Sequence, residues 1–576
     1  MSPWRILRVV LILAPVFALA AIAGWYVFNQ FDSPSIGDPG STDDPGRLVV
    51  VVSFDQMRGD YPDRWNSSLG DDGFRKIQSE GVWYANAHLP YACTSTGPGH
   101  ASIGTGVPPS VHGIIENDWY DRAKAKRIYC ATGERPYDRV PANADAGSRS
   151  KESTGMSPER LLVPTIGDAL RSGTNKKSRV FSLALKDRAA VLMGGKDPSG
   201  AYCFDTATGQ FHTTSYYRDR VHPWVEKFNA SKAADRWFNT DWERLGDPLI
   251  YNRLAGPDDQ PGESIDLMGK GRVFPHPLGK GQPEPGGKYY AQLEKSPFGN
   301  DLVWDFAKEC IREEKLGLGG SPDLLYLGFS SNDLIGHAWG PDSHEVLDVT
   351  LRSDRLVADI IAHLEKSVGK GRFALIITAD HGVCPLPEFV RNKLPEAARF
   401  KVTDELTPLN EALDETFGGS EVGGGNWVEA VEYPWIYLNR RSIAARGIPL
   451  ETVEAFATQW VSNRDHHQDS FTRKQLAGPP LADPLGRSVQ LAYHPDRCGE
   501  VYALPRPYCI PNYTTGTGTT HGSPHPYDTH VPVFAYGLGV PKTGRKDDKT
   551  SALIVAPIVC KSLGIEPPKH LAEKAP

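Results

Sequence analysis

Five short runs of apolar residues, separated by longer mixed segments, predict strands that are buried on both faces. Such runs are typical of a parallel sheet that is covered by helices. Apolar positions over 342–368 broadly follow helical spacing and give the clearest helix prediction. We therefore expect an α/β fold with a central, mostly parallel sheet flanked by helices. The predicted strands are 47–54, 179–185, 323–330, 372–379 and 530–537.

Two long segments break this alternation, at about 189–299 and about 388–520. The first is rich in proline, glycine and aromatic residues, with a predicted hairpin over 202–217 and a short helix over 221–228. Because the strands on either side complete one sheet, we interpret both segments as insertions that wall a site. A single domain is therefore expected over residues 47–576.

The N-terminal residues predict export. Arg5 and Arg8 precede an apolar run that ends near Phe28, about long enough to span a bilayer. Small residues in this run also fit a cleaved signal peptide, so residues 1–28 are either an N-terminal anchor or a signal peptide. Residues 29–46 are polar and rich in glycine and proline, which predicts a flexible linker. Export would place the protein in the periplasm, or on a membrane facing the periplasm or the exterior.

Charge and cysteine content narrow the classes of function. The 63 Lys and Arg residues against 70 Asp and Glu residues give a net charge of −7, which argues against a nucleic-acid-binding surface. An anionic small molecule would need a local positive site, and we expect a monomer. The eight cysteines show no CxxC spacing, although Cys498 and Cys509 could close a loop in an oxidising compartment.

Charged side chains follow the predicted strands at one end. Asp55, Lys186 and Asp333 each come at or just after the end of an apolar run, and Asp380 with His381 ends a fourth. Open α/β sheets build their sites at the carboxyl ends of their strands. One acidic residue after a strand is more often a cap, but four such ends indicate a shared site.

The ligand types in this set predict a metal centre. Asp333 and His337 are four residues apart, a spacing that brings two ligands to one ion from a helical turn. His521 completes a set of three Asp and three His side chains with Asp55, Asp380 and His381. Mixed carboxylate and imidazole ligands favour Zn²⁺ or Mn²⁺ over Ca²⁺ or Mg²⁺. Two such ions form a clamp for in-line displacement at phosphorus.

The segment CTSTGPGH, residues 93–100, offers three hydroxyl side chains beside a Gly/Pro corner. Taken alone, it is best explained as a turn with a Ser or Thr cap at a helix that starts near Pro98. A nucleophile among Thr94, Ser95 and Thr96 is the alternative.

Seven motifs together resemble the alkaline phosphatase superfamily, in its nucleotide pyrophosphatase/phosphodiesterase-like branch. Within that branch the chain is most similar to the phosphate-irrepressible alkaline phosphatases, exported monoesterases with a Thr nucleophile. The resemblance covers most of 47–556 and implies an alkaline-phosphatase-like sheet with inserted cap segments. The motifs are VSFDQMRGDY, TGPGHASIGTG, HGIIENDWYD, LKDRAA, SSNDLIGHAWGPDS, TADHG and GTTHGSPHPYDTHVPV.

The resemblance also implies roles for individual residues. The Thr-x-Pro-x-His motif makes Thr96 the nucleophile, which would form a phosphothreonine intermediate, and leaves His100 as a structural residue. Asn117, Lys186 and Arg188 match residues that contact the phosphate. One zinc ion is expected on Asp55, Asp380 and His381 with Thr96 as a neighbouring ligand, and a second on Asp333, His337 and His521.

Lys186 and Arg188 favour small phosphate monoesters as substrates. A monoester has three unesterified oxygens, so two cations can be used beyond the metals, whereas a diester carries an alkyl group on one of them. A phosphodiesterase or nucleotide pyrophosphatase remains the alternative. A sulfatase is disfavoured because its motif needs Cys or Ser, then Arg, where this chain has Thr96 and His100. A non-catalytic binding protein on the same scaffold is disfavoured because all expected ligands are present.

Overall fold

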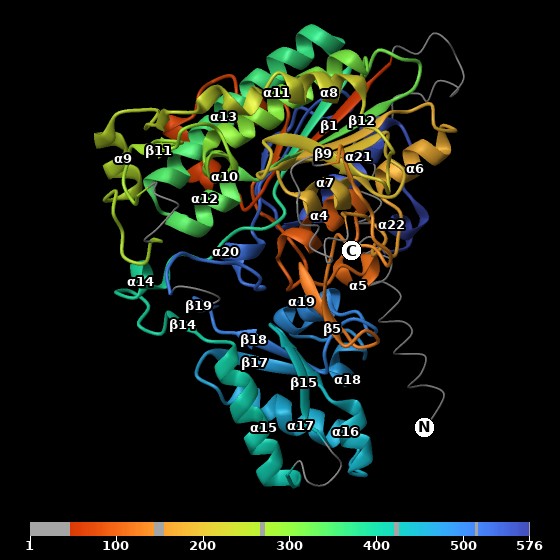
Figure 1. Ribbon diagram of the computed structural model, residues 1–576, viewed down its shortest axis with the longest axis vertical. Coiled ribbons are helices and arrows are strands. Elements are labelled where there is room, and N and C mark those ends of the chain that lie inside the picture. The colour runs from red at the N-terminus through yellow and green to blue at the C-terminus, as the bar shows by residue number, and fades with distance from the viewer. Residues whose placement is uncertain (1–45, 143–154, 265–270, 420–424, 513–515, 575–576) are drawn as a thin grey trace, which may run out of the picture.

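The computed structural model describes residues 46–142, 155–264, 271–419, 425–512 and 516–574 (Figure 1). The predicted signal peptide or anchor at 1–28, and the linker up to residue 45, lie outside the described residues. Within the described part, no helix combines the length and the apolar character needed to cross a bilayer.

A ten-stranded sheet forms the centre of the molecule, in the order β21-β2-β20-β13-β1-β12-β7-β8-β9-β6. The strands β13, β1, β12, β7 and β8 run parallel to one another, which confirms the expected mostly parallel α/β architecture. These five strands span Phe373–Thr378, Leu48–Phe54, Asp323–Phe329, Val180–Ala184 and Gly200–Asp205. The outer strands are Gly544–Lys546 (β21), Val82–Tyr84 (β2), Val533–Gly537 (β20), Gln210–Thr214 (β9) and Arg139–Val140 (β6).

Of the five predicted strands, β20 is antiparallel to the strand beside it. It pairs antiparallel with β13, with Ile377 opposite Phe534. The direction follows from the position of His521, which lies in the loop before this strand at the carboxyl edge of the parallel strands. A strand that leaves this edge must run back across the sheet.

The core explains why these strands read as unbroken apolar runs. All seven residues of β1 are buried, because helices cover both faces of the sheet. One face is covered by Thr96–Thr105 (α4), Ile166–Gly173 (α6), Asp187–Gly194 (α7) and Val555–Leu563 (α21). The other face is covered by Phe74–Glu80 (α3), Pro297–Glu313 (α11) and His344–Leu364 (α13). The helix α13 confirms the clearest helix prediction, which was made for 342–368.

The first part of the segment expected as a first insertion belongs to the central sheet, and only the later part lies outside the sheet. The predicted hairpin is formed by β8 and β9, which extend the sheet toward its edge. The predicted short helix is present as Pro223–Ala230 (α8). The rest of the segment contains Thr240–Trp242 (β10), Pro248–Ala255 (α9), His276–Leu278 (β11) and Gly287–Glu294 (α10).

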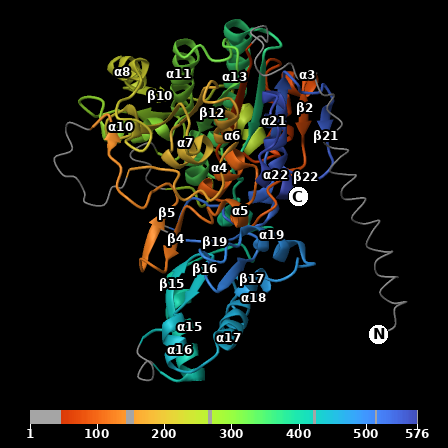
Figure 2. The same ribbon diagram turned by 90° about the vertical axis from the view of Figure 1, so that its right-hand side faces the viewer.

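The segment expected as a second insertion forms a unit that projects from the sheet, at the bottom of Figures 1 and 2. It has its own four-stranded sheet, in the order β15-β16-β18-β17, and its own apolar cluster. We refer to residues 403–505 as the projecting unit. Its strands are Val428–Glu432 (β15), Trp435–Leu438 (β16), His467–Thr472 (β17) and Val501–Pro505 (β18), and its main helices are Thr403–Phe417 (α15), Arg440–Ala445 (α16) and Leu450–Ser462 (α17).

The loop closure considered for Cys498 and Cys509 is wrong, since both are free thiols. The Cys498 side chain accepts a hydrogen bond from the backbone N–H of His494 inside the main core. The Cys509 thiol instead donates to the carbonyl of Glu396, on the strand Cys509–Pro511 (β19) that pairs with Ala398–Phe400 (β14). Each sulfur therefore faces a different part of the chain.

Asp348 on α13 holds the β10–α9 segment against the central domain. Its carboxylate is fully buried and accepts hydrogen bonds from Trp242 Nε1 at 2.7 Å, Tyr251 Oη at 2.5 Å and the Leu245 backbone N–H at 2.7 Å. Arg352 Nε balances its charge at 2.6 Å. One buried acceptor thus satisfies donors from three points of the segment.

Replacing Asp348 with Ala is expected to lower the free energy of unfolding by about 3 kcal/mol or more, because it leaves buried indole, phenol and amide donors unpaired. Urea denaturation of the purified protein measures this. The matched control is Asp241→Ala on the same segment, where the side chain is exposed and a change within about 0.5 kcal/mol is expected. Equal stability of the two variants would contradict this role.

Candidate active site

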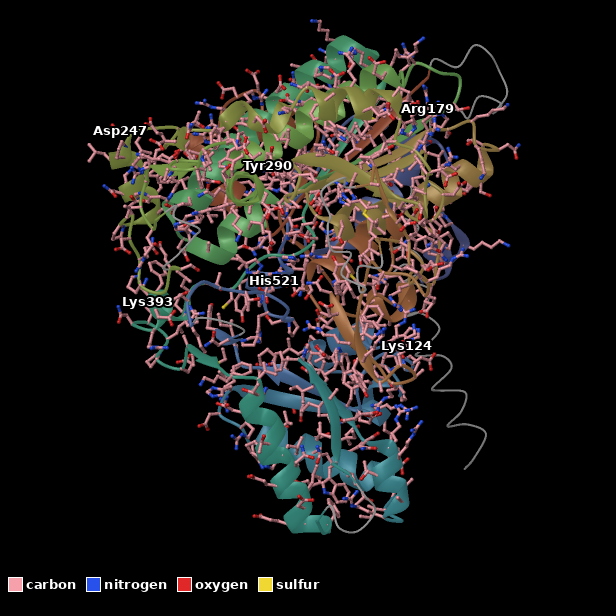
Figure 3. All side chains as sticks on the ribbon, viewed as in Figure 1. Lys124, Arg179, Asp247, Tyr290, Lys393 and His521 are labelled. Carbon is pink, nitrogen blue, oxygen red and sulfur yellow. The ribbon has the colours of Figure 1, made fainter. Side chains whose placement is uncertain are left out.

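The parallel strands bring the predicted site residues to one edge of the sheet. Asp55 follows β1, Asp380 with His381 follows β13, and Lys186 follows β7. Asp333 lies in the first turn of Ser331–Trp339 (α12), the helix that follows β12. His521 comes from the loop before β20, and Figure 3 shows it where the central domain meets the projecting unit.

The first cluster consists of Asp55, Asp380 and His381, all fully buried. His381 Nε2 lies 3.6 Å from Asp55 Oδ1 and 3.3 Å from Asp380 Oδ2. The second consists of Asp333, His337 and His521, with Asp333 Oδ1 lying 3.1 Å from His337 Nε2 and 3.6 Å from His521 Nε2. The His381 and His521 rings stack with centroids 3.5 Å apart, so the two clusters adjoin.

Backbone carbonyls orient all three imidazoles. Nδ1 of His337 donates to Thr519 O at 2.7 Å, Nδ1 of His381 to Gly382 O at 2.9 Å, and Nδ1 of His521 to Thr94 O at 2.8 Å. Each Nε2 lone pair then faces the carboxylates. This arrangement is typical of histidines that bind metals, where the second ring nitrogen is held by a carbonyl or a carboxylate.

Lys186 lies between the two clusters. Its ammonium nitrogen is 2.7 Å from Asp55 Oδ2 and 2.5 Å from Asp333 Oδ2. Burial acts to lower the pKa of Lys186, but Asp333 and Asp55 outweigh it and raise the pKa. Burial and the Asp380 carboxylate raise the pKa of Asp55 to about 8, although Lys186 opposes this. Asp333 and Asp380 differ from Asp55: although burial acts to raise their pKa values, His337 and Lys186 lower that of Asp333, and His381 and His100 lower that of Asp380.

The donor set fits two divalent cations. Asp55 Oδ1 is buried and accepts no hydrogen bond from the described residues. Burial lowers the pKa of His381 to about 3, so its imidazole is neutral and available as a ligand. The first cluster offers two carboxylates and one imidazole, and the second offers one carboxylate and two imidazoles. Such mixed ligands suit a first-row transition metal better than Ca²⁺.

Thr96 begins α4 at the junction of the clusters. Its hydroxyl oxygen lies 3.4 Å from His381 Nε2 and 3.4 Å from Arg188 Nη2. Asn117 Oδ1 accepts a hydrogen bond from the Gly97 N–H at 2.7 Å, which fixes this first turn. The helix begins two residues earlier than expected. Ser95 occupies its N-cap position, as a Ser or Thr cap predicts, but the Ser95 side chain makes no capping hydrogen bond.

Thr94 has a structural role. Its hydroxyl donates to Ser523 O at 2.8 Å, and its carbonyl orients His521. Of the three hydroxyl residues in the segment, Thr96 therefore has its oxygen beside a metal-type cluster.

Two further residues connect the ligands, and the sequence analysis missed one of them. Gln56 donates from Nε2 to Asp333 Oδ1 at 2.7 Å and from its backbone N–H to Asp380 Oδ1 at 3.1 Å, which links the clusters. Its φ of 67° is a left-handed conformation that is uncommon outside glycine and is often found at functional sites. His100, expected as structural, contacts Asp380 Oδ2 through Nδ1 at 3.1 Å and so orients a ligand.

Tyr129 and Asp187 position Arg188. Tyr129 ends Lys126–Tyr129 (β5), which pairs with Asp118–Asp121 (β4) in a hairpin, and its hydroxyl donates to Asp187 Oδ1 at 2.6 Å. Arg188 Nη1 donates in turn to the same Tyr129 oxygen at 3.4 Å. Asp187 stands between Lys186 and Arg188 in the sequence, but only the fold brings the hairpin to it.

Comparison with known proteins identifies the family. Residues 49–528 match the family model described as type I phosphodiesterase / nucleotide pyrophosphatase. The chain belongs to this family. Because 480 of 576 residues are matched, the family defines most of the chain, including every predicted site residue.

Similar proteins include several named alkaline phosphatase and one named calcium-transporting ATPase. Alkaline phosphatase PhoV from Synechococcus elongatus is 33% identical over 523 residues, which cover 91% of this chain and 90% of the relative. A protein named calcium-transporting ATPase from Myroides odoratus is 32% identical over 526 residues, 91% of this chain and 92% of the relative. The crystal structure of alkaline phosphatase PafA superposes with a TM-score of 0.80 at 29% identity, covering 92% of this chain and 97% of that one.

Substituting Asp380 with Asn is expected to remove about one equivalent of bound metal, because a neutral amide is a weak ligand beside His381. Elemental analysis of the purified protein measures this. His466→Gln, which removes an imidazole of the projecting unit outside both clusters, is the control and should keep the wild-type metal content. Unchanged metal content in the Asp380 variant would exclude it as a ligand.

Proposed function

We propose that this protein hydrolyses phosphate monoesters, as an alkaline phosphatase that depends on two zinc ions. The observation that carries the proposal is the position of the Thr96 hydroxyl, at the start of a helix and between His381 and Arg188. The relatives named alkaline phosphatase support it over nearly the whole chain.

The chain's own residues account for substrate positioning. The start of α4 turns its positive end toward an arriving phosphoryl group. Arg188 donates to its unesterified oxygens, and Lys186 reaches the same region from between the clusters. When bound, metal ions on the two clusters would lower the pKa of the Thr96 hydroxyl and neutralise charge on the phosphoryl group.

The reaction then takes two displacements at phosphorus. Thr96 Oγ1 forms a bond to phosphorus while the ester P–O bond breaks, and the alcohol leaves. Water then attacks the phosphothreonine, which releases inorganic phosphate and restores the Thr96 hydroxyl. Fixed positive groups around the phosphoryl oxygens supply most of the stabilisation of such transition states.

A phosphodiesterase or nucleotide pyrophosphatase is the second candidate, which the description of the family model favours. Against it stands Arg188, which is held by Tyr129 so that it faces the Thr96 oxygen. Two cations beyond the metals match the three free oxygens of a monoester better than the two of a diester.

Zinc is proposed over manganese because each cluster mixes carboxylate with imidazole. The apolar residues before position 28 support export, to the periplasm or to a membrane surface facing the periplasm or the exterior. We propose one domain over residues 47–576 and a monomer.

Replacing Thr96 with Ala is expected to lower kcat/KM for an aryl phosphate monoester by about 10³-fold or more, because loss of a nucleophile leaves only binding and electrostatic stabilisation. Thr96→Ser keeps the hydroxyl and is expected to retain most of the activity. Acid quench after a single turnover should trap phosphate on Thr96. A Thr96→Ala variant with activity equal to Thr96→Ser would contradict covalent catalysis.

The double variant Lys186→Ala/Arg188→Ala separates the two candidates. It should lose about 10²-fold or more in kcat/KM for an aryl phosphate monoester, because charge-assisted contacts to the free oxygens disappear. The matching aryl diester should be affected much less. A wild-type preference for the diester, or equal losses on both esters, would favour the phosphodiesterase.

A further inference from the structure

A small pocket opens beside the site, where the central domain meets the projecting unit. His521, a residue of the second cluster, forms part of its wall, so it is continuous with the catalytic edge. The rest of the wall comes from both sides of the junction and includes Ser95, Glu116, Ser523 and Asp528 on one side and Tyr433 on the other.

Glu116 places this pocket within reach of a substrate bound at Thr96. Its carboxylate accepts a hydrogen bond from the Ser95 hydroxyl, and the adjacent Asn117 accepts one from the Gly97 N–H. The two residues thus hold the chain on both sides of the nucleophile. A group esterified to phosphorus extends only a few bonds from Thr96, so its far end meets the pocket wall.

The described wall of the pocket carries two carboxyl groups, those of Glu116 and Asp528. Among the described residues of its wall, none is a lysine or an arginine. No ion pair of Glu116 occurs within the described part of the chain. Asp528, the other carboxyl group, accepts hydrogen bonds from Ser523 through its hydroxyl at 2.6 Å and its N–H at 2.9 Å. Burial raises the pKa of both carboxyl groups, each to about 7; Ser95 opposes this at Glu116, and Ser523 and Arg58 oppose it at Asp528.

We propose that this pocket binds the alcohol portion of the substrate and selects cationic amino alcohols, with Glu116 accepting a hydrogen bond from the ammonium group. The inference rests on the proposed monoesterase function and specifies its substrate class. A carboxylate that already receives a Ser95 hydroxyl and a backbone N–H retains lone pairs for a further donor. A leaving group with a second negative charge would instead face the Glu116 carboxylate, which has no ion pair among the described residues.

Three small monoesters of similar size test this with the zinc-loaded protein: ethanolamine phosphate, ethyl phosphate and phosphoglycolate. They carry an ammonium group, no polar group and a carboxylate at the same distance from phosphorus. We expect kcat/KM to fall in that order, by about tenfold from the first to the second, as one charge-assisted hydrogen bond is lost. A wild-type preference for phosphoglycolate, or equal values for all three, would overturn the proposal.

Glu116→Gln assigns the preference to a residue. The glutamine can still accept from Ser95, but it removes the charge that attracts the ammonium group. The ratio of kcat/KM for ethanolamine phosphate to that for ethyl phosphate should fall about tenfold. Glu432→Gln is the matched control: it removes one glutamate charge from the projecting unit, where Glu432 pairs with Arg127 outside the pocket, and should leave the ratio unchanged. Equal ratios in wild type and Glu116→Gln would overturn the assignment.

Salt provides a second measurement that does not depend on the variant folding. The wild-type preference for ethanolamine phosphate over ethyl phosphate should shrink as ionic strength rises, because salt screens a partly accessible charge pair. A preference that is independent of salt would contradict an ionic basis. If the wild type cleaves none of the three monoesters but hydrolyses an aryl diester, the monoesterase function itself fails, a result distinct from equal rates on all three.

Discussion

Three buried carboxylates at the end of one sheet are the constraint on which the rest of the site depends. Asp55, Asp333 and Asp380 reach the same edge because β1, β12 and β13 run parallel and side by side. Burying such charges is costly unless they are paired or bind metal. Lys186 between the clusters supplies one positive charge, and burial keeps the His381 imidazole neutral. The buried carboxylates at the centre of the fold therefore favour binding of divalent cations, and Thr96, the proposed nucleophile, lies beside them.

The strand ends could be predicted from the sequence because the pattern of a buried parallel strand is local. An unbroken apolar run that ends in Asp55 or Asp380 predicts both the strand and the residue that lies at the carboxyl end of that strand. The ligand spacing of Asp333 and His337 is local in the same way. His521 does not stand at the end of an apolar run, so the local pattern does not place it; it was included because it completes the set of three Asp and three His side chains, and the family resemblance supplied its partners Asp333 and His337.

The residues that were missed act through contacts between distant parts of the chain. Gln56 connects ligands that are 277 and 324 positions away, and nothing in its neighbourhood distinguishes it from an ordinary turn residue. Tyr129 and Glu116 depend on how the β4–β5 hairpin packs against α4 and α7. The predicted Ser or Thr cap makes no capping hydrogen bond for a similar reason, since the Ser95 side chain contacts Glu116, which lies in the loop before β4.

The same hairpin connects nucleophile, cation and pocket. Asn117 at its start fixes the first turn of α4, and Tyr129 at its end holds Arg188. Arg122 at its tip pairs with Glu500, a fully buried residue of the projecting unit that also accepts the Leu438 N–H at 2.8 Å. A displacement of the projecting unit would therefore move the pocket wall and the groups beside Thr96 together. Under the two proposals above, selection of the alcohol and orientation of the phosphoryl group would both depend on this hairpin.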